Sequence, residues 1–321
     1  GTQDNVNQKL KSKLGEDSVG EMICLGRCYE NSAFYYNGEN YSGDDINQLD
    51  DILSGNHKST PDTMKSFSET SFLVEDEVFS TYKDFKDLLE TCFQTDKNDL
   101  IDTLKDSGLR GRGGAGFPTG MKWEIVSKYN GTKYVAVNGD EGEPGTFKDR
   151  NYLEKDPHRF LEGALIASLF IKAANVYIYM RDEYPAVIKI LKDEILKLEN
   201  EKIIPKGHFV IRRGAGAYIC GEESAMIESI EGKRGLPRHR PPYVAEVGLF
   251  NSPTLTNNLE TLFWIRDILE KGAKWYDEKG TGGNKGFHSF SVSGRVKEPG
   301  VKVAPAGITI QELIDDYCGG M

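Results

Sequence analysis

The stretch Gly108–Gly120 is the most chemically suggestive part of the sequence, because five of its first nine residues are glycines. Glycine lets the backbone approach a ligand closely, and successive free amides bind anions. Arg110 and Arg112 lie between the glycines and can place positive charge beside a phosphate. The stretch therefore predicts a phosphate-binding loop, with a plain surface loop as the alternative.

This loop does not fit the two standard nucleotide motifs. Residues 111–116 match G-x-G-x-x-G, but residues 100–109 before it predict a helix where the dinucleotide fold needs a strand. No G-x-x-x-x-G-K-[ST] sequence is present either. Its ligand must therefore be inferred from the rest of the sequence.

An acidic turn, residues 138–145, follows a short β-branched run at 134–138. It places Asn138, Asp140, Glu141 and Glu143 at the end of a predicted strand. Side chains of this kind can hold a divalent ion, accept hydrogen bonds from ribose or ribityl hydroxyls, or simply form a solvated turn. The segment alone does not choose among these.

A second glycine-rich element, residues 214–223, leads from a predicted strand into a predicted helix at 224–230. Gly221, Glu222 and Glu223 then fall at the helix N-terminus, where free amides favour an anion or a hydroxyl-rich ligand. Cys220 has no histidine near it in sequence, so we interpret it as a buried residue and not a nucleophile.

Two further segments carry weaker signals. The basic, proline-rich loop 233–243 can clamp a diphosphate and stack an aromatic ring on adenine, or can be a solvated loop. Asn257 and Asn258 stand at the start of an apolar helix, where asparagine is a common cap.

The elements that must position these segments alternate between strand and helix. Apolar periodicity predicts strands at 134–138, 176–180 and 209–212 and helices at 157–174 and 185–199. This order is typical of right-handed βαβ units, so we predict an α/β fold with a Rossmann-like parallel sheet. Ligands of such sheets bind at the carboxyl ends of the strands, so both glycine-rich loops and the acidic turn should meet in one cleft.

Composition and charge narrow the class of protein. The chain has 321 residues and a formal charge of -10, which argues against a nucleic-acid partner. The most apolar stretch, 164–180, is interrupted by Lys172, so we expect no direct membrane contact. Five cysteines without repeated spacing favour a reducing compartment, and the polar first residues favour the cytoplasm. The first residue, Gly1, and the glycine-rich end suggest a boundary inside a longer polypeptide.

Residues 106–260 resemble the NADH-binding flavoprotein subunit of respiratory complex I and its relatives in NAD-linked formate dehydrogenases and hydrogenases. The resemblance implies that the chain binds FMN and NAD(H). The implied FMN residues are Gly111, Arg112, Gly113, Gly114, Lys122, Asn138, Asp140, Glu141, Gly221, Glu222, Asn257 and Asn258. The implied NAD(H) residues are Phe117, Glu143, Tyr218, Glu223, Arg240 and Tyr243, of which Arg240 replaces a common lysine and Tyr243 a common phenylalanine.

The flanking segments extend this resemblance. Cys24 and Cys28 look like the second half of a thioredoxin-like [2Fe-2S] site, which two thiolates alone should not complete. We therefore expect four parts. These are a partial thioredoxin-like segment at 1–54, a linker and lead-in at 55–94, the FMN and NAD(H) domain at 95–285, and the start of a ligand-binding β-grasp domain at 286–321. The domain that carries a [4Fe-4S] cluster in these relatives is absent from the sequence.

The thioredoxin-like segment and the C-terminal tail look most like the β subunit of an NAD-dependent formate dehydrogenase, which favours that parent enzyme. The resemblance then implies hydride transfer between NAD(H) and FMN, with electrons passed to iron-sulfur clusters. Implied partners are a thioredoxin-like [2Fe-2S] subunit and a molybdenum- or cluster-bearing α subunit. The alternatives are a complex I or hydrogenase subunit, and a nucleotide-binding scaffold without redox activity.

Overall fold

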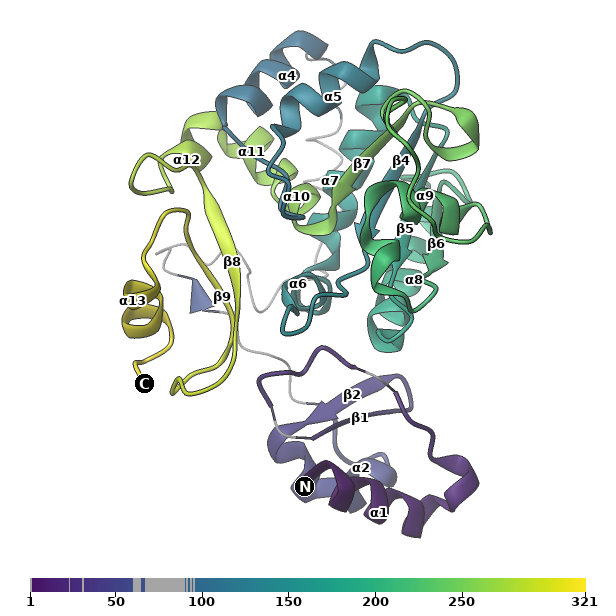
Figure 1. Cartoon of the computed structure of the whole chain (residues 1–321), viewed down its shortest axis with the longest axis vertical. Helices are drawn as coiled ribbons and strands as arrows, with labels where there is room; N and C mark the ends of the chain where they lie inside the picture. The colour runs from purple at the N-terminus through teal and green to yellow at the C-terminus, as the bar shows by residue number, and fades with distance from the viewer. Residues whose placement is uncertain are drawn as a thin grey trace.

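The computed structural model describes residues 2–22, 24–30, 32–59, 65–66, 90, 92, 94 and 96–321. Figure 1 shows three groups of elements, with a small N-terminal unit below, a large domain built on a parallel sheet above, and a C-terminal hairpin with a short helix beside it. Most of the predicted linker and lead-in at 55–94 lies outside the described residues.

The N-terminal unit packs two helices against a two-stranded antiparallel sheet. Helices α1 (Thr2–Leu14) and α2 (Leu49–Leu53) cover strands β1 (Ala33–Tyr36) and β2 (Glu39–Ser42). A 3₁₀ turn (Gly43–Gln48) leads directly into α2. Helix α1 was not predicted, because polar residues dominate its sequence and only a narrow stripe is apolar. The core consists of Val6, Leu10, Phe34, Tyr41, Leu49 and Ile52.

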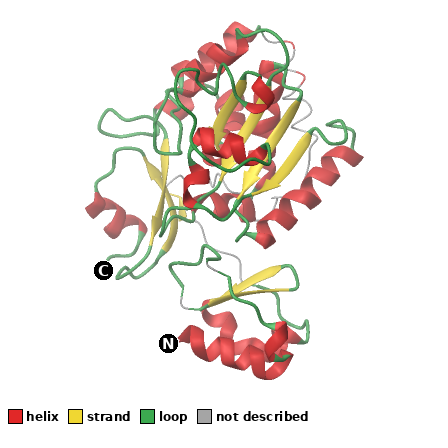
Figure 2. Ribbon diagram, turned by 45° about the vertical axis from the view of Figure 1, so that its right-hand side comes forward, coloured by secondary structure: helices red, strands yellow, loops and turns green. Residues whose placement is uncertain are grey.

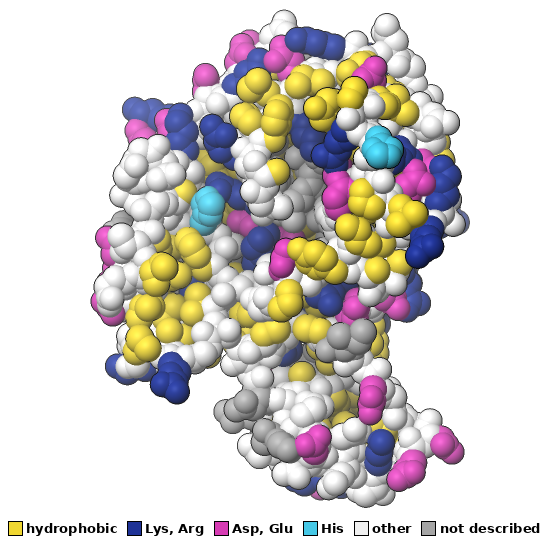
Figure 3. Space-filling view, viewed as in Figure 1, with side chains coloured by type: hydrophobic (Ala, Val, Ile, Leu, Met, Phe, Trp, Pro, Cys, Tyr) yellow, Lys and Arg dark blue, Asp and Glu magenta, His cyan; other side chains and the backbone are white. Residues whose placement is uncertain are grey.

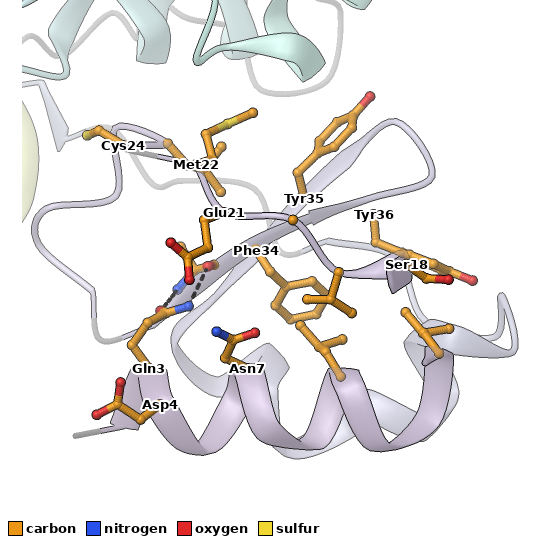
Figure 4. A pocket seen from close by; sticks show the side chains of 16 residues that line it. Gln3, Asp4, Asn7, Ser18, Glu21, Met22, Cys24, Phe34, Tyr35 and Tyr36 are labelled. Carbon is orange, nitrogen blue, oxygen red and sulfur yellow. Dashed lines mark hydrogen bonds between the residues drawn. The ribbon is translucent and has the colours of Figure 1, made fainter. Parts of the chain in front are cut away.

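A hollow of about 650 Å³ opens within this unit, between α1, residues 18–22, 24 and 25, and β1 (Figure 4). The side-chain amide of Gln3 spans one side of it. That amide accepts from the backbone N–H of Ala33 at 2.9 Å and donates to the carbonyl of the same residue at 3.3 Å. Gln3 thus satisfies backbone groups on the edge of β1 in the way a neighbouring strand would.

The large domain is built on a parallel sheet with helices packed around it (Figure 2). The sheet has four strands in the order β6, β5, β4, β7 (Figure 1). The strands are β4 (Tyr134–Gly139), β5 (Asn175–Met180), β6 (Phe209–Arg213) and β7 (Thr254–Asn258). The first three are the predicted strands, which confirms the α/β class. β7 was not predicted, because its residues Thr254–Asn258 carry no apolar alternation.

Both faces of the sheet are covered, as a parallel sheet requires. Val135 and Val137 of β4 face a core shared with α7 (Pro157–Ile171) and α8 (Pro185–Asn200). Ala136 instead faces Met226 and Ile227 of α9 (Glu223–Ile230). Successive strand residues point to opposite faces, so this alternation follows directly from the pleat.

Several helices begin or end at residues that favour a helix terminus. α7 (Pro157–Ile171) has the side chain of Asp156 as N-cap and Lys172 in the left-handed region at its end, and α8 (Pro185–Asn200) begins with a proline. α9 (Glu223–Ile230) has Glu222 as its N-cap. The remaining helices are α4 (Lys97–Asp106), α5 (Thr119–Ser127), α6 (Lys148–Lys155), α10 (Leu259–Phe263), α11 (Ile265–Lys271) and α12 (Ala273–Asp277).

The C-terminal group forms a small sheet of its own. β8 (Phe287–Val292) and β9 (Gly300–Pro305) are antiparallel, and the two-residue strand β3 (Lys65–Ser66) lies parallel to β9. After the hairpin, the chain forms α13 (Ile310–Glu312) followed by a π-helical turn (Leu313–Tyr317). The β-grasp assignment of this group stays a prediction.

Within the described part of the chain, no helix is both long and apolar enough to cross a bilayer.

Candidate functional site

The first glycine-rich loop connects α4 to α5 and closes on itself. The N–H of Gly111 donates to the carbonyl of Phe117 at 2.9 Å, and the Arg110 guanidinium donates to the carbonyl of Gly116 at 3.1 Å. Gly114 and Gly116 have positive φ values of 105° and 64°. L-residues rarely adopt such values, so glycine is required at these two positions.

This loop lies against the start of α10, far away in sequence. A Cβ added to Gly113 would lie 3.2 Å from the Cβ of Asn258, and the N–H of Arg112 donates to the hydroxyl of Thr261 at 2.9 Å. The side chain of Arg112 leaves in another direction and donates to the hydroxyl of Tyr276 at 2.8 Å and to His288. Any contact of Arg112 with FMN would therefore come from its backbone, while its side chain is committed elsewhere.

The acidic turn is tied directly to the second glycine-rich loop. The side-chain amide of Asn138 donates to the carbonyl of Gly221 at 2.8 Å, and its oxygen accepts the N–H of Asp140 at 3.1 Å. A Cβ on Gly221 would lie 3.3 Å from the carbonyl oxygen of Asp140. The absence of a side chain at Gly221 is what lets the two loops approach.

Glu141 is turned toward the protein interior. Its carboxylate accepts the N–H groups of Asp149 at 2.9 Å and Arg150 at 3.3 Å, and the hydroxyl of Tyr184 at 3.3 Å. Burial, followed by the neighbouring Asp149 carboxylate, raises its pKa to about 7. The side chain of Glu141 therefore anchors the turn on α6.

The second glycine-rich loop ends in a 3₁₀ turn (Tyr218–Gly221) that leads into α9. The Glu222 carboxylate accepts the N–H groups of Ser224 at 2.9 Å and Ala225 at 3.0 Å, and Arg240 donates to its other oxygen. Burial acts against the charge of Glu222, but these donors outweigh it and lower its pKa. The loop 233–243 is thereby held against the start of α9.

Several predicted nucleotide residues meet across these loops. Lys122 of α5 donates to Glu223 at 2.7 Å, and the hydroxyl of Tyr218 donates to Glu143. The rings of Phe117, Tyr218 and Tyr243 come from three different loops, and their residues are 45%, 64% and 60% exposed. Exposed rings of this kind are available for stacking on a flat heterocycle.

The two asparagines at the end of β7 have different roles. Asn257 is buried and accepts the indole N–H of Trp123 at 3.1 Å. Asn258 caps α10 by accepting the N–H of Glu260 at 3.0 Å, and its amide donates to Asp149 at 2.7 Å. Of the two, only Asn258 retains partial exposure at the loops.

Sequence reasoning missed a buried charge cluster beneath the site. Lys148 lies 2.7 Å from Asp149 and 2.9 Å from Glu260, and the hydroxyl of Ser289 donates to Glu260 at 2.9 Å. Burial opposes the charge of Lys148, but the carboxylates of Asp149 and Glu260 raise its pKa. A carboxylate within the apolar run at 259–265 is the one signal that could have revealed it.

Cys24 and Cys28 lie on a loop that contacts α6. The N–H of Gly26 donates to the Cys24 sulfur at 3.3 Å, and burial, together with Cys24, raises the pKa of the Cys28 thiol. Among the described residues, no group of three or more His, Cys, Asp or Glu side chains could hold a metal ion. The half-site assignment of the two cysteines stays a prediction.

The three predicted segments thus lie together at the carboxyl edge of the parallel sheet. Together with Lys122 of α5 and the loop 233–243, they offer backbone amides, amide and carboxylate acceptors, two paired cations and three exposed rings. Figure 3 shows a hollow in the upper domain with side chains of both charge signs around it. Such a donor set suits a hydroxyl-rich, phosphorylated ligand with a flat ring better than a single divalent ion.

Comparison with known proteins identifies the family. The model of the Nuo51 FMN-binding domain matches residues 104–267. The chain is 42% identical over 255 residues to an NADH-quinone oxidoreductase subunit of Rhizobium meliloti (strain 1021), covering 76% of this chain and 61% of the relative. It is 45% identical over 240 residues to an NADH-quinone oxidoreductase subunit of Aquifex aeolicus (strain VF5), covering 72% and 56%.

A solved structure agrees with the sequence relatives. The crystal structure of an NAD+-reducing [NiFe]-hydrogenase in the H2-reduced state matches with a TM-score of 0.76 and 33% identity, over 92% of this chain and 53% of that chain. The chain thus spans between half and two thirds of the length of the proteins it matches. On these grounds the chain belongs to the Nuo51 FMN-binding domain family.

Proposed function

We propose that this chain is the FMN-binding, NADH-oxidising module of a larger enzyme of the NADH-quinone oxidoreductase type. One observation supports the proposal above all. The side-chain amide of Asn138 in the acidic turn donates to the carbonyl of Gly221 in the second glycine-rich loop at 2.8 Å, and the first loop lies beside them. Three segments far apart in sequence form one site, and the relatives named above share the family.

The residues of the site fit FMN. Gly113 and Gly221 leave no room for side chains where the loops meet, and Gly114 and Gly116 keep open space around them. Asn258 and Asp140 supply partly exposed acceptors suited to ribityl hydroxyls. Bound FMN would supply the hydride acceptor.

The protein's own residues then bind and orient the nucleotide. Tyr218, Phe117 and Tyr243 present rings for stacking, and Glu143 holds the Tyr218 hydroxyl. Lys122 and Arg240 carry positive charge beside Glu222 and Glu223 at the start of α9. None of these groups needs to act as acid, base or nucleophile, because the task is alignment of two flat rings.

The comparisons favour a complex I type of parent enzyme over the formate dehydrogenase assignment expected from the chain's flanks. The curated relatives named above are NADH-quinone oxidoreductase subunits, and the solved relative is an NAD+-reducing hydrogenase. Iron-sulfur subunits as electron acceptors belong to the same proposal, as does a cytoplasmic location. Purification from the native host, with identification of the copurifying subunits, distinguishes the three parent enzymes.

The direct test is a spectrum of the purified chain. Added FMN should bind with a saturable change in its absorption, and anaerobic NADH should then bleach the flavin band. A protein that acquires no flavin spectrum would instead be the redox-inactive scaffold.

Tyr218→Ala and Glu143→Ala test whether these two residues serve NAD(H) and not FMN. Each should lower kcat/KM for NADH oxidation about tenfold, because the stacking ring or its anchor is lost, while FMN stays bound. Tyr35→Ala, an exposed tyrosine of the N-terminal unit, is the matched control. Loss of FMN from both site variants would refute the assignment of these residues to the nucleotide.

A further inference from the structure

A second cavity borders the first glycine-rich loop, on the side away from the acidic turn. It has a volume of about 470 Å³ and is formed by the end of α4, the loop itself and residues 283–288 before and within β8. We propose that this cavity is a binding site for a small oxyanion of the phosphate class, separate from the FMN and NAD(H) site. The proposal does not depend on the proposed function.

The charges that line the cavity are all of one sign. Lys105, Arg110, Arg112 and Lys285 line it, whereas no carboxylate is among its lining residues. This is unusual for a chain with a formal charge of -10. A cleft lined by one sign of charge concentrates ions of the opposite sign.

Lys105 and Lys285 are partly neutralised by ion pairs from outside the cavity, and the buried Glu260 carboxylate attracts Arg112, whereas Arg110 has no such compensation in the part of the chain that the structure describes. Lys105 pairs with Glu124 at 2.8 Å and Lys285 with Asp277 at 3.0 Å. Within the described residues, Arg110 forms no ion pair and donates to the carbonyl of Gly116. Net positive charge therefore remains on the arginine side of the cavity.

Arg112 provides the most specific observation. Its two terminal nitrogens donate to the neutral partners Tyr276 and His288. Its Nε is buried and has no hydrogen-bond acceptor among the described residues. A buried donor on a cation is costly when left unpaired, and an oxyanion in the adjoining cavity would relieve that cost.

His288 is compatible with this arrangement because it is uncharged near neutral pH. Burial, and then the neighbouring Arg112, lower the pKa of its imidazole. A neutral ring accepts from Arg112 without adding a second positive charge beside the guanidinium.

Backbone geometry also suits an anion. Gly108, Gly120 and Gly283 line the cavity, and Gly283 has a φ of 82° with open space around its Cα. The space beside Gly108 and Gly120 is filled by Lys285 and by the backbone of α4, so Gly283 is the position where an oxyanion could reach the backbone.

The cavity faces away from the acidic turn. Gly113 approaches Asn258 on the site side of the loop, whereas the side chain of its neighbour Arg112 runs to Tyr276 and His288. Arg112 is the one residue predicted for FMN that lines the cavity, and no residue predicted for NAD(H) does. An anion bound here would touch the same loop that forms the wall of the flavin site.

Isothermal titration of the full chain with inorganic phosphate, at constant ionic strength and with FMN present, tests the proposal. One saturable site is expected. Lys285→Gln and Arg110→Gln should each weaken phosphate binding by at least about tenfold, because each removes a charge-assisted hydrogen bond. The matched control is Lys274→Gln, which removes a lysine paired with Glu278 at 3.3 Å that does not line the cavity.

Three results would overturn the proposal. The first is the absence of a saturable phosphate site, and the second is equal weakening in the Lys274 control, which would indicate unspecific charge effects. The third is loss of binding only in Arg240→Gln, which would place the phosphate in the nucleotide site. Circular dichroism of each variant shows that it is folded, and the second cavity variant replaces any variant that is not.

Discussion

Asp140 illustrates how the fold alters a single residue. It follows β4 at the edge of the sheet, where burial raises the pKa of its carboxyl to about 6 although Arg181 opposes the shift. The proposed site thus holds a carboxyl that titrates close to neutral pH. The sequence identified Asp140 as a site residue but contained no information about this shift, since burial depends on the surrounding loops.

The raised pKa of Asp140 predicts a pH-dependent stability. The unfolded chain has a pKa near 3.9 for Asp, below the folded value, so the stability contributed by the protonated carboxyl is complete below about pH 4 and is lost as the pH rises to about 6. Between pH 4 and pH 7, the free energy of unfolding of Asp140→Asn should therefore rise by about 1–2 kcal/mol relative to that of the natural chain, after allowance for solvent screening.

Chemical denaturation of both proteins at the two pH values measures this gain. Lys189→Met, which alters an exposed ion pair with Asp193, controls for general charge effects. If the free energies of unfolding of Asp140→Asn and the natural chain changed with pH in parallel, ionisation of the Asp140 carboxyl would not destabilise the fold, and the prediction would be wrong.

At the scale of elements, the close crossing of α7 and α10 holds the site in register. A Cβ on Gly163 of α7 would lie 1.9 Å from the carbonyl oxygen of Leu262 in α10. Asn258 caps α10, which supplies Glu260 and Thr261, so this crossing positions part of the predicted flavin site.

Gly163→Ala should consequently cost about 2–4 kcal/mol of stability, because the added methyl group meets backbone and not a flexible side chain. Thermal and urea unfolding provide the measurement. Gly20→Ala, where nothing lies within 4 Å, should change stability by no more than about 0.5 kcal/mol. A similar effect at both positions would mean that helix packing at Gly163 is not tight.

At the scale of the whole molecule, the cluster around Lys148 joins parts that are distant in sequence. Lys148 contacts Asp149 and Glu260, Asn258 links Asp149 to α10, and Ser289 brings in the C-terminal strand β8. Glu260 is buried, yet Lys148 and Arg112 overcome the effect of burial and lower its pKa.

Lys148→Met should destabilise the chain by about 3–5 kcal/mol, because two buried carboxylates lose their cation. Adding Glu260→Gln should recover part of this loss, since one uncompensated charge disappears. Guanidinium unfolding of the single and double variants measures both effects. Destabilisation that is merely additive in the double variant would contradict charge compensation as the cause.

The N-terminal unit meets the same region. Tyr29 accepts from Arg150 at 3.1 Å, and Arg27 lies 3.7 Å from Glu154 of α6. The loop that carries Cys24 and Cys28 is thereby held against the helix that anchors Glu141, which places the two cysteines beside the flavin domain.

The sequence by itself determined the local parts of this protein. The βαβ order from β4 to β6, the capping of α7, α9 and α10, and the glycine-rich character of both loops follow from short-range periodicity, backbone preference and capping chemistry. These features depend on residues within a few positions of one another, which is why a single sequence reveals them.

Only the tertiary structure decided what lies between those parts. β7 pairs with β4 across more than a hundred residues, as Tyr134 opposite Thr254 shows, and this pairing delivers Asn258 to the acidic turn. The partnership of Lys148 with Glu260 and the direction of the Arg112 side chain arise in the same way. The energy of such contacts depends on burial and long-range packing, to which local sequence patterns are insensitive.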